Sequence, residues 1–286
     1  MRIALLVCPA SGLGAAGRVA GTVAACLRQI SPDVQPFVAR DAEGTARFAH
    51  EAVTGGADVL AVLGGDGAAH AAVQACAGSQ TALAIIPAGT GNDFARAFSL
   101  SLDGVDEALR QGSRRQVDLG RVRGGAWFGT VLCAGFDSRV NERANQLRWP
   151  RGPRRYDLAV LAEIAQLRAD PLVVRTEHES LELDATLIAV GNTPYYGGGI
   201  PVCPDADPAD GLLDVTIARR VGRGQLVRIL PQLRAGRHTD HPAVTTLRAR
   251  SLTIEGNDWV GYADGERQRE LPLHLDCVPN ALTLVA

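Results

Sequence analysis

A buried strand that runs directly into a glycine-rich loop is the feature that most constrains this chain. Residues 58–63, Asp-Val-Leu-Ala-Val-Leu, include five apolar residues in six, and the loop Gly64-Gly65-Asp66-Gly67 follows at once. The apolar run predicts a buried strand. Because glycines leave backbone N–H groups open to close approach, the loop predicts a phosphate-binding turn that carries one carboxylate.

The segments around this loop predict a parallel sheet with helices between its strands. Apolar runs typical of strands occupy residues 3–8, 34–39, 58–63 and 82–86, and patterns typical of helices occupy residues 17–29, 43–53 and 68–77. Strands that alternate with helices in this way predict a doubly wound α/β fold. We place this nucleotide-binding domain at residues 1–119.

After residue 118 the pattern changes to strands with few helices between them. Strands are expected at residues 121–123, 127–132, 172–176, 183–190, 212–218, 251–255, 271–275 and 281–285, and helices at residues 139–146, 156–167 and 223–233. The fold class is therefore α/β plus all-β. The second, β-rich domain is placed at residues 120–278, and residues 279–286 are free to rejoin the first domain.

Length and composition exclude several classes of protein. A chain of 286 residues has room for two domains, and no run approaches the roughly 18 apolar residues of a membrane-spanning helix. The apolar N-terminal run is too short for a signal peptide, so we expect a cytoplasmic location. The six cysteines are scattered singly, which indicates neither a zinc site nor a disulfide framework.

The basic residues narrow the choice of enzyme further. All 29 are arginine, and the chain contains no lysine. This excludes the lysine of Walker A loops, the strand lysine of protein kinases and any Schiff-base enzyme. A formal net charge of −2 gives no sign of nucleic-acid binding, so no nucleic-acid partner is expected.

A second glycine-rich loop follows the next predicted strand. It reads Pro87-Ala-Gly-Thr-Gly-Asn-Asp93, and either Thr90 or Asn92 can cap the helix expected after it. Both loops leave the carboxyl edge of the sheet, where ligands bind in such folds. Asp66 and Asp93 beside backbone amides suit a magnesium–nucleotide without any lysine, and a turn or helix cap is the structural alternative for each aspartate.

A third glycine pattern offers a different nucleotide site. Gly12, Gly14 and Gly17 fit the dinucleotide-binding fingerprint after the first strand, and Asp41 stands near the place of a ribose-binding acid. An ordinary turn, or a phosphate-contacting loop of a kinase, explains the same glycines. The pattern therefore keeps a dinucleotide-binding oxidoreductase open as an alternative.

These motifs, in this order, resemble the diacylglycerol kinase catalytic family, which includes bacterial lipid kinases and sphingosine kinases. The resemblance runs through the whole chain, and the segments that carry it are residues 7–12, 64–67, 86–96, 116–118, 134–137, 191–199, 210–214 and 264–266. It implies an N-terminal domain like those of phosphofructokinase and NAD kinase, a C-terminal β-sandwich, and an ATP site with Mg²⁺ in the cleft between them.

The resemblance also implies roles for individual residues. Asp66 and Asp93 would hold the catalytic magnesium, with Asp118 extending the acidic network, and either Asp66 or Glu266 would be the base for the lipid hydroxyl. Asp137 would lie on the substrate side. The residues implied in nucleotide binding are Ser11, Gly12, Gly64, Gly65, Gly67, Gly89, Thr90, Gly91 and Asn92, and those implied in a structural magnesium site are Asp207, Asp210 and Leu212.

Three positions depart from the pattern of the family. Ala68, Ala71 and Cys8 stand where threonine, glutamate and asparagine are usual. Each change removes a polar contact worth about 0.5–1.5 kcal/mol near the nucleotide, which would weaken ATP binding, alter the donor or abolish turnover. His70 lies among these changes, and an exposed helix histidine or a polar replacement near the nucleotide are both interpretations of it.

A basic stretch points to the acceptor. Residues 139–156 contain six arginines, one glutamate and Trp149. Arginines around an interfacial tryptophan predict docking on anionic lipid headgroups, and a solvated loop that covers the sandwich is the alternative.

The expected function is an ATP-dependent lipid kinase that phosphorylates diacylglycerol or a related lipid while peripherally bound to a membrane surface. A homodimer is left open. Three other functions stay open: a soluble-metabolite kinase of the NAD kinase type, the dinucleotide-binding oxidoreductase, and a kinase-derived lipid-binding protein without turnover. Against the first, the Asn-Glu pair that NAD kinases use has no counterpart at residues 70–71 of this chain.

Overall fold

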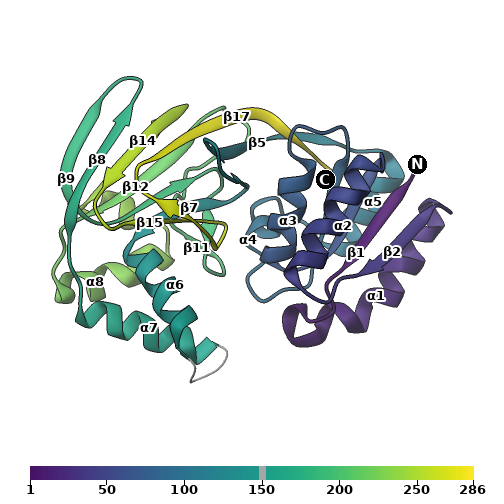
Figure 1. Cartoon of the computed structure of the whole chain (residues 1–286), viewed down its shortest axis with the longest axis horizontal. Coiled ribbons are helices and arrows are strands. Elements are labelled where there is room, and N and C mark those ends of the chain that lie inside the picture. The colour runs from purple at the N-terminus through teal and green to yellow at the C-terminus, as the bar shows by residue number, and fades with distance from the viewer. Residues whose placement is uncertain (148–152) are drawn as a thin grey trace.

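Strands from the first and last parts of the chain pair within one mixed sheet, so backbone hydrogen bonds join the two halves of the molecule. The computed structural model describes residues 1–147 and 153–286, without the side chains of residues 145, 153–157 and 227. Figure 1 shows the N-terminal half on the right and the C-terminal half on the left, connected at the top by β5 and β17.

The N-terminal half is built on a parallel sheet with the strand order β2–β1–β3–β4. Its strands are β1 (Ile3–Val7), β2 (Val34–Val38), β3 (Val59–Gly64) and β4 (Ala82–Pro87). Helices α1 (Ser11–Ile30) and α5 (Leu102–Gln111) cover one face, and α2 (Ala42–Thr54), α3 (Asp66–Cys76) and α4 (Asp93–Ala97) cover the other (Figure 1). The predicted doubly wound α/β architecture is confirmed.

The pleat of β3 explains why its apolar run is uninterrupted. Leu60 and Val62 pack under α2 and α3, whereas Ala61 and Leu63 pack under α1 and α5. Successive side chains of a strand point to opposite faces, and here both faces are covered by helices. Every residue of β3 is therefore buried, and the loop that follows is placed at the carboxyl edge of the sheet.

Helix α5 lies in a stretch for which no helix was predicted. Ser101 caps it by accepting the N–H of Gly104, and Val105, Ala108 and Leu109 form its buried face. These spacings are those of an amphipathic helix. Together with α1, the helix covers one face of the parallel sheet.

The C-terminal half is a β-sandwich with three helices at one end, and its predicted all-β character is confirmed. Its core contains Phe128, Leu132, Ile254 and Trp259, all buried. The elements are β5 (Arg115–Val122), β6 (Trp127–Phe128), β7 (Val131–Gly135), α6 (Phe136–Gln146), α7 (Pro153–Ala165), β8 (Asp170–Thr176), β9 (Ser180–Gly191), β10 (Tyr195–Tyr196), β11 (Ile200–Pro201), β12 (Leu213–Arg219), α8 (Arg223–Arg234), a 3₁₀ turn (His238–Asp240), β13 (Val244–Ala249), β14 (Ser251–Gly256), β15 (Val260–Ala263), β16 (Glu266–Glu270) and β17 (Leu273–Leu284).

Strand β17 belongs to both halves. It pairs with β14 and β5 in the sandwich, and its end pairs in parallel with β4 through Leu284 and Leu83. Ala281, Leu282 and Leu284 pack in the core of the N-terminal half. Two separate strands were expected here, and the domain limit predicted at residue 278 falls inside this one strand. The division at residues 119 and 278 stays a prediction, which the packing of these last residues favours.

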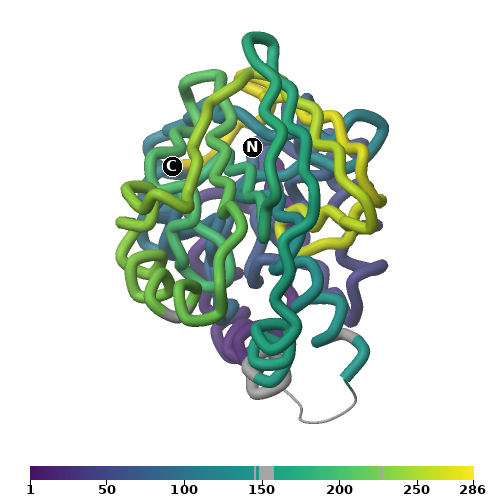
Figure 2. Tube along the Cα trace, turned by 90° about the vertical axis from the view of Figure 1, so that its left-hand side faces the viewer, coloured from purple at the N-terminus to yellow at the C-terminus, as the bar shows by residue number. Residues whose placement is uncertain are grey.

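The helices of the C-terminal half gather at one end of the sandwich. Figure 2 shows α6 and α7 at the bottom, whereas the hairpin between β8 and β9 rises to the opposite end. In the part of the chain that the structure describes, no helix combines the length and the apolar character needed to span a bilayer.

Candidate active site

The two predicted glycine loops touch each other at the carboxyl edge of the parallel sheet. Gly65 follows β3 and Gly89 follows β4, and a Cβ atom on Gly89 would lie 2.5 Å from the Cα atom of Gly65. The Ser11 hydroxyl, after β1, lies 3.9 Å from the position of a Cβ on Gly65. Only residues without side chains allow this approach, so the glycines bring three loops to one place.

The carboxylate of Asp66 ties the first loop to the second. Its Oδ2 accepts the N–H of Asn92 at 2.8 Å, and its Oδ1 accepts the N–H of Asp93 at 2.7 Å. Asp66 therefore caps α4, a role that we had assigned to Asn92 or Thr90. The Asn92 side chain instead bonds to Gly89 in both directions, at 2.9 Å each.

Asp93 is buried beside Asp66. Its Oδ2 accepts the N–H of Gly198 at 2.9 Å, and its Oδ1 has no hydrogen-bond partner among the residues that the structure describes. Burial raises the pKa of Asp93, and the charge of Asp66 raises it further, against hydrogen bonds from Gly198 and Gly199 and the charge of Arg96. Two neighbouring carboxylates with a buried, unpaired oxygen fit a divalent cation, which would relieve their repulsion.

This pair is smaller than a complete protein cage for a metal. Within the described residues, no group of three or more His, Cys, Asp or Glu side chains could hold an ion. Magnesium in nucleotide sites is commonly held by one or two carboxylates together with phosphate oxygens and water. Asp66 and Asp93 match that smaller donor set.

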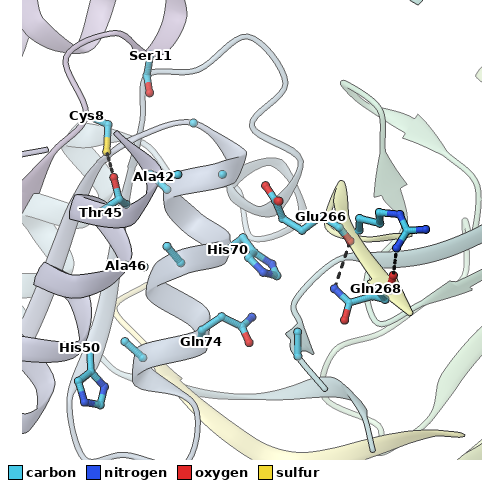
Figure 3. Close-up of a pocket in the computed structure, with 17 residues that line it drawn as sticks. Cys8, Ser11, Ala42, Thr45, Ala46, His50, His70, Gln74, Glu266 and Gln268 are labelled. Atoms are coloured by element: carbon cyan, nitrogen blue, oxygen red, sulfur yellow. Dashed lines mark hydrogen bonds between the residues drawn. The ribbon is translucent and has the colours of Figure 1, made fainter. Parts of the chain in front are cut away.

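A cleft of about 740 Å³ separates α2 and α3 from the hairpin of β15 and β16 (Figure 3). Ser11, Gly65, Gly67 and Glu266, four of the predicted site residues, line it. The side chain of Glu266 reaches across from the C-terminal half toward the start of α3. Six other predicted nucleotide residues are not among those that line the cleft: Gly12, Gly64, Gly89, Thr90, Gly91 and Asn92.

His70 lies inside this cleft, so its interpretation as an exposed helix histidine is wrong. Its Nδ1 is 3.1 Å from Oδ2 of Asp264, and the two side chains are only 12% and 8% exposed. Asp264 also accepts N–H groups of Gly129 and Thr130 and the Thr130 hydroxyl. Sequence reasoning gave Asp264 no role, although it begins the Asp-Gly-Glu motif.

Asp118 is buried, and its bonds go to other segments. Its Oδ2 accepts the N–H of Gly211 and its Oδ1 the N–H of Asn280, both at 2.8 Å. Among the described residues no hydrogen bond joins it to Asp66 or Asp93. Asp118 thus holds β5 to the loop before β12 and to β17, and an acidic network from Asp118 to Asp66 stays a prediction.

An arginine of β13 pairs with the loop that was expected to hold a structural magnesium. Arg248 pairs with Asp210 and, at 3.2 Å, with Asp214. The other Asp210 oxygen accepts the N–H of Leu212, and Asp207 accepts the N–H of Ala209. Because the Arg248 guanidinium already pairs with Asp210 and Asp214, it occupies the place of a cation, so the structural magnesium site stays a prediction which this pairing disfavours.

Asp137 lies at the start of α6, under the sandwich, and bonds to Tyr196. The Tyr196 hydroxyl donates to its Oδ2 at 3.0 Å. Burial raises the pKa of Asp137 to about 6, although the Tyr196 bond and the charge of Arg139 oppose this. Its place on the substrate side stays a prediction.

The two arginines of the basic stretch whose side chains the structure describes are engaged in ion pairs. Arg139 and Arg143 both pair with the buried Glu163 of α7, and Arg139 also lies 3.6 Å from Asp170. Arg148, Trp149 and Arg151 lie outside the described residues, as do the side chains of Arg154 and Arg155. The pairs hold α6 against α7, so this part of the stretch is structural.

The residues of the alternative dinucleotide fingerprint have structural uses. Asp41 caps α2 by accepting the N–H of Gly44 at 2.7 Å. Gly17 packs on Pro9, where an added Cβ would lie 3.3 Å from the Pro9 Cβ. The acid that was expected to bind a ribose is thus already engaged.

Comparison with known proteins identifies the family. A family profile described as "Diacylglycerol kinase catalytic domain" matches residues 2–122, and one described as "YegS C-terminal NAD kinase beta sandwich-like domain" matches residues 130–286. The chain is 41% identical over 292 residues to a protein named "Diacylglycerol kinase" from Mycobacterium tuberculosis, an alignment that covers 99% of this chain and 94% of the relative. The chain belongs to the diacylglycerol kinase family.

Other members of the diacylglycerol kinase family are more distant. A "Probable lipid kinase YegS-like" from Yersinia enterocolitica is 29% identical over 244 residues, covering 82% of the chain and 81% of that relative. Among solved structures, a putative diacylglycerol kinase from Bacillus anthracis has a TM-score of 0.83 at 22% identity, covering 99% and 94% of the two chains. An NAD kinase from Archaeoglobus fulgidus in complex with ATP has a TM-score of 0.56 at 10% identity over 100% and 94%.

These likenesses confirm the fold of the diacylglycerol kinase and NAD kinase structures, with an N-terminal α/β half and a C-terminal β-sandwich. They place the chain among the lipid kinases. A dinucleotide oxidoreductase is therefore not supported.

Proposed function

We propose that this protein transfers the γ-phosphate of ATP to the hydroxyl of diacylglycerol or a related lipid at a membrane surface. The observation that carries the proposal is the pairing of Asp66 and Asp93 beside the glycine loops, with Glu266 of the C-terminal half across the cleft. Phosphoryl transfer depends mainly on positioning and on neutralisation of charge. Acids on both sides of one cleft would align a hydroxyl with the γ-phosphate and limit the access of water.

Each group of residues has a distinct part in this proposal. Backbone N–H groups of the loops at Ser11, Gly65 and Gly89 would cradle the phosphates, and Asp66 and Asp93 would hold Mg²⁺. The chain has no lysine to neutralise the phosphate oxygens. Bound magnesium would supply that positive charge. Asp118 would act at a distance, because it fixes β5 to β17 and so sets how the two halves face each other.

The acceptor and the membrane are proposed on separate grounds. Relatives named diacylglycerol kinase support a lipid acceptor. Leu158 and Leu161, almost one turn apart on α7, are 42% and 64% exposed. Exposed leucines on one helix favour contact with lipid tails, as expected for a cytoplasmic protein that binds membranes peripherally.

The test is a phosphate-transfer assay on a panel of lipids. Purified protein with Mg²⁺ and labelled ATP or GTP is presented with vesicles of diacylglycerol, sphingosine and monoacylglycerol, and Asp66→Asn is the matched variant. We expect one lipid to be labelled and Asp66→Asn to lower the rate by about a hundredfold or more. Absence of labelled lipid together with unchanged nucleotide binding by Asp66→Asn would refute the proposal.

The same assay separates the two kinase-related alternatives. Labelled NADP in place of labelled lipid would indicate a soluble-metabolite kinase, although the pair at residues 70–71 is His-Ala. Vesicle binding without consumption of any nucleotide would indicate a lipid-binding protein that has lost turnover through Cys8, Ala68 and Ala71. All three residues line the cleft, where a bound nucleotide would meet them.

A further inference from the structure

A histidine from one half of the molecule and an aspartate from the other meet in the cleft. His70 lies on α3, one turn after Asp66, and Asp264 lies in the turn between β15 and β16. Their 3.1 Å contact joins residues 194 positions apart. Figure 3 shows the His70 ring on the wall of the cleft, facing the side from which Glu266 enters.

The hydrogen bonds of Asp264 fix the orientation of this imidazole. Its Oδ1 accepts the N–H of Thr130 at 2.8 Å and the Thr130 hydroxyl at 2.6 Å, and its Oδ2 accepts the N–H of Gly129 at 2.9 Å. A carboxylate with these donors is an acceptor for His70 as well, so Nδ1 carries the shared proton. The second ring nitrogen, Nε2, has no hydrogen bond among the described residues, and His70 lines the cleft.

The geometry points to His70 as the general base for the acceptor hydroxyl, with Asp264 as the residue that orients it. This inference rests on the proposed function. An aspartate that holds Nδ1–H leaves Nε2 as a lone-pair acceptor and stabilises the imidazolium formed when a proton arrives. The chain therefore carries a His–Asp pair split between its two halves, complete only when both face the cleft.

The surrounding charges suit this role. Burial lowers the pKa of His70, but the hydrogen bond and charge of Asp264 and the charge of Glu266 outweigh burial, so the pKa lies above its ordinary value of 6.5. Asp66 stands one turn earlier on α3, and Arg267 lines the opposite wall. A raised pKa strengthens the pull of the imidazole on the proton of the acceptor.

The other two candidate bases are less suited to the step. Both Asp66 oxygens accept N–H groups of Asn92 and Asp93, which holds that carboxylate as a cap and, in the proposed function, as a magnesium ligand. Glu266 is exposed, and no hydrogen bond orients its carboxylate within the described residues. Its negative charge beside His70 instead favours the imidazolium.

The acceptor oxygen forms a bond to the γ-phosphorus while the bond from that phosphorus to the bridging oxygen of ATP breaks, and the bonding electrons leave with ADP. The hydroxyl proton passes to Nε2 of His70, while Nδ1 keeps its own proton in the hydrogen bond to Asp264. Release of the phosphorylated lipid and ADP lets the imidazolium return its proton to water.

The test compares variants of the whole protein in the lipid assay across pH. His70→Asn keeps an amide donor for Asp264 but has no basic nitrogen, and His70→Ala leaves room for added imidazole. His50→Ala is the matched control, because His50 is a second histidine on the same cleft. Melting temperature and binding of a fluorescent ATP analogue show that each variant is folded and binds nucleotide.

We expect the kcat of His70→Asn to fall by about 10²- to 10⁴-fold with nucleotide affinity retained. The acid limb of the wild-type profile, centred above 6.5, should disappear in this variant. Added imidazole should restore part of the activity of His70→Ala and none to His50→Ala. If the wild type phosphorylates lipid and His70→Asn has the same kcat and the same acid limb, this inference alone would be overturned. No lipid phosphorylation by the wild type would overturn the proposed function, and the inference with it.

Discussion

Gln74 and the backbone of Trp127 bond to each other in both directions. The Gln74 Nε2 donates to the Trp127 carbonyl at 2.8 Å, and the Trp127 N–H donates to the Gln74 Oε1 at 2.9 Å. Gln74 stands one turn after His70 on α3, so two successive turns of this helix contact the C-terminal half. The side-chain amide thus makes the two hydrogen bonds that the backbone of a neighbouring strand would make with Trp127 of β6.

Gln74→Ala should therefore loosen the contact between the two halves. It leaves a carbonyl and an N–H of Trp127 without partners, and we expect the free energy of unfolding to fall by about 1–3 kcal/mol. Urea denaturation measures this. Gln111→Ala is the control, because Gln111 is exposed at the end of α5, bonds to Glu107 of the same helix and should change stability little. Equal stabilities for the two variants would contradict the expectation.

Gly91→Ala should displace the carboxylate of Asp66 while leaving the fold intact. A Cβ at this position would lie 2.4 Å from the Asp66 Oδ2, closer than atoms pack. We expect the rate of phosphate transfer to fall by about a hundredfold, the size of effect that a shift of about 1 Å in a reacting group produces. Gly21→Ala on α1 is the control, because its Cβ meets nothing within 4 Å. Full activity in Gly91→Ala would show that the position of Asp66 is unimportant.

Asp137→Asn should flatten one part of the dependence of stability on pH. The pKa of Asp137 is raised from 3.8 to about 6 in the folded protein, so between these values the folded state holds a proton that the unfolded chain releases. This contribution is full below pH 3.8 and is lost as the pH rises through 6. The difference corresponds to about 3 kcal/mol.

The variant should therefore gain stability relative to the wild type between pH 4 and pH 7. The asparagine oxygen still accepts the Tyr196 hydroxyl, so the hydrogen bond is kept. Urea denaturation at several pH values measures the difference between the two proteins. A difference that stays constant across this range would mean that Asp137 is ionised throughout.

Chelation of metal should leave the stability of the wild type unchanged, because we expect no metal in the loop before β12. Arg248 already pairs with Asp210 and Asp214 there. Arg248→Met should lower the free energy of unfolding by about 1 kcal/mol, because the arginine is half exposed. The variant, unlike the wild type, should then be stabilised by added Mg²⁺ in a thermal melt. If the melting temperature of the wild type falls in EDTA, the predicted structural magnesium site would be supported after all.

Much of the fold could be predicted because its elements carry local signals. The apolar runs of β1, β3 and β4 and the glycines after them mark strands and loops without reference to the rest of the chain. Strands β15 and β16 escaped prediction because charged and small residues dominate them. Strand β17 was divided in two because Val278-Pro-Asn280 interrupts its apolar pattern, although the structure continues it as a strand.

The site was predictable only as far as its motifs reach. Asp66, Asp93 and Glu266 stand in recognisable loops. By contrast, His70, Asp118 and Arg248 bond to residues that are 194, 162 and 38 positions away in the chain. Such contacts depend on how the two halves meet, which no local pattern records. The one available signal for His70 was its place beside Ala68 and Ala71, where polar side chains were expected.

The strand that serves both halves also sets an order of events during synthesis. The N-terminal half cannot complete its core until residues 281–285 leave the ribosome, because those residues pack against β4 and close its edge. Until then β4 presents an unpaired edge, and contacts separated by about two hundred residues must wait. The same strand pairs with β5 and β14, so an interrupted chain would leave the cores of both halves unfinished.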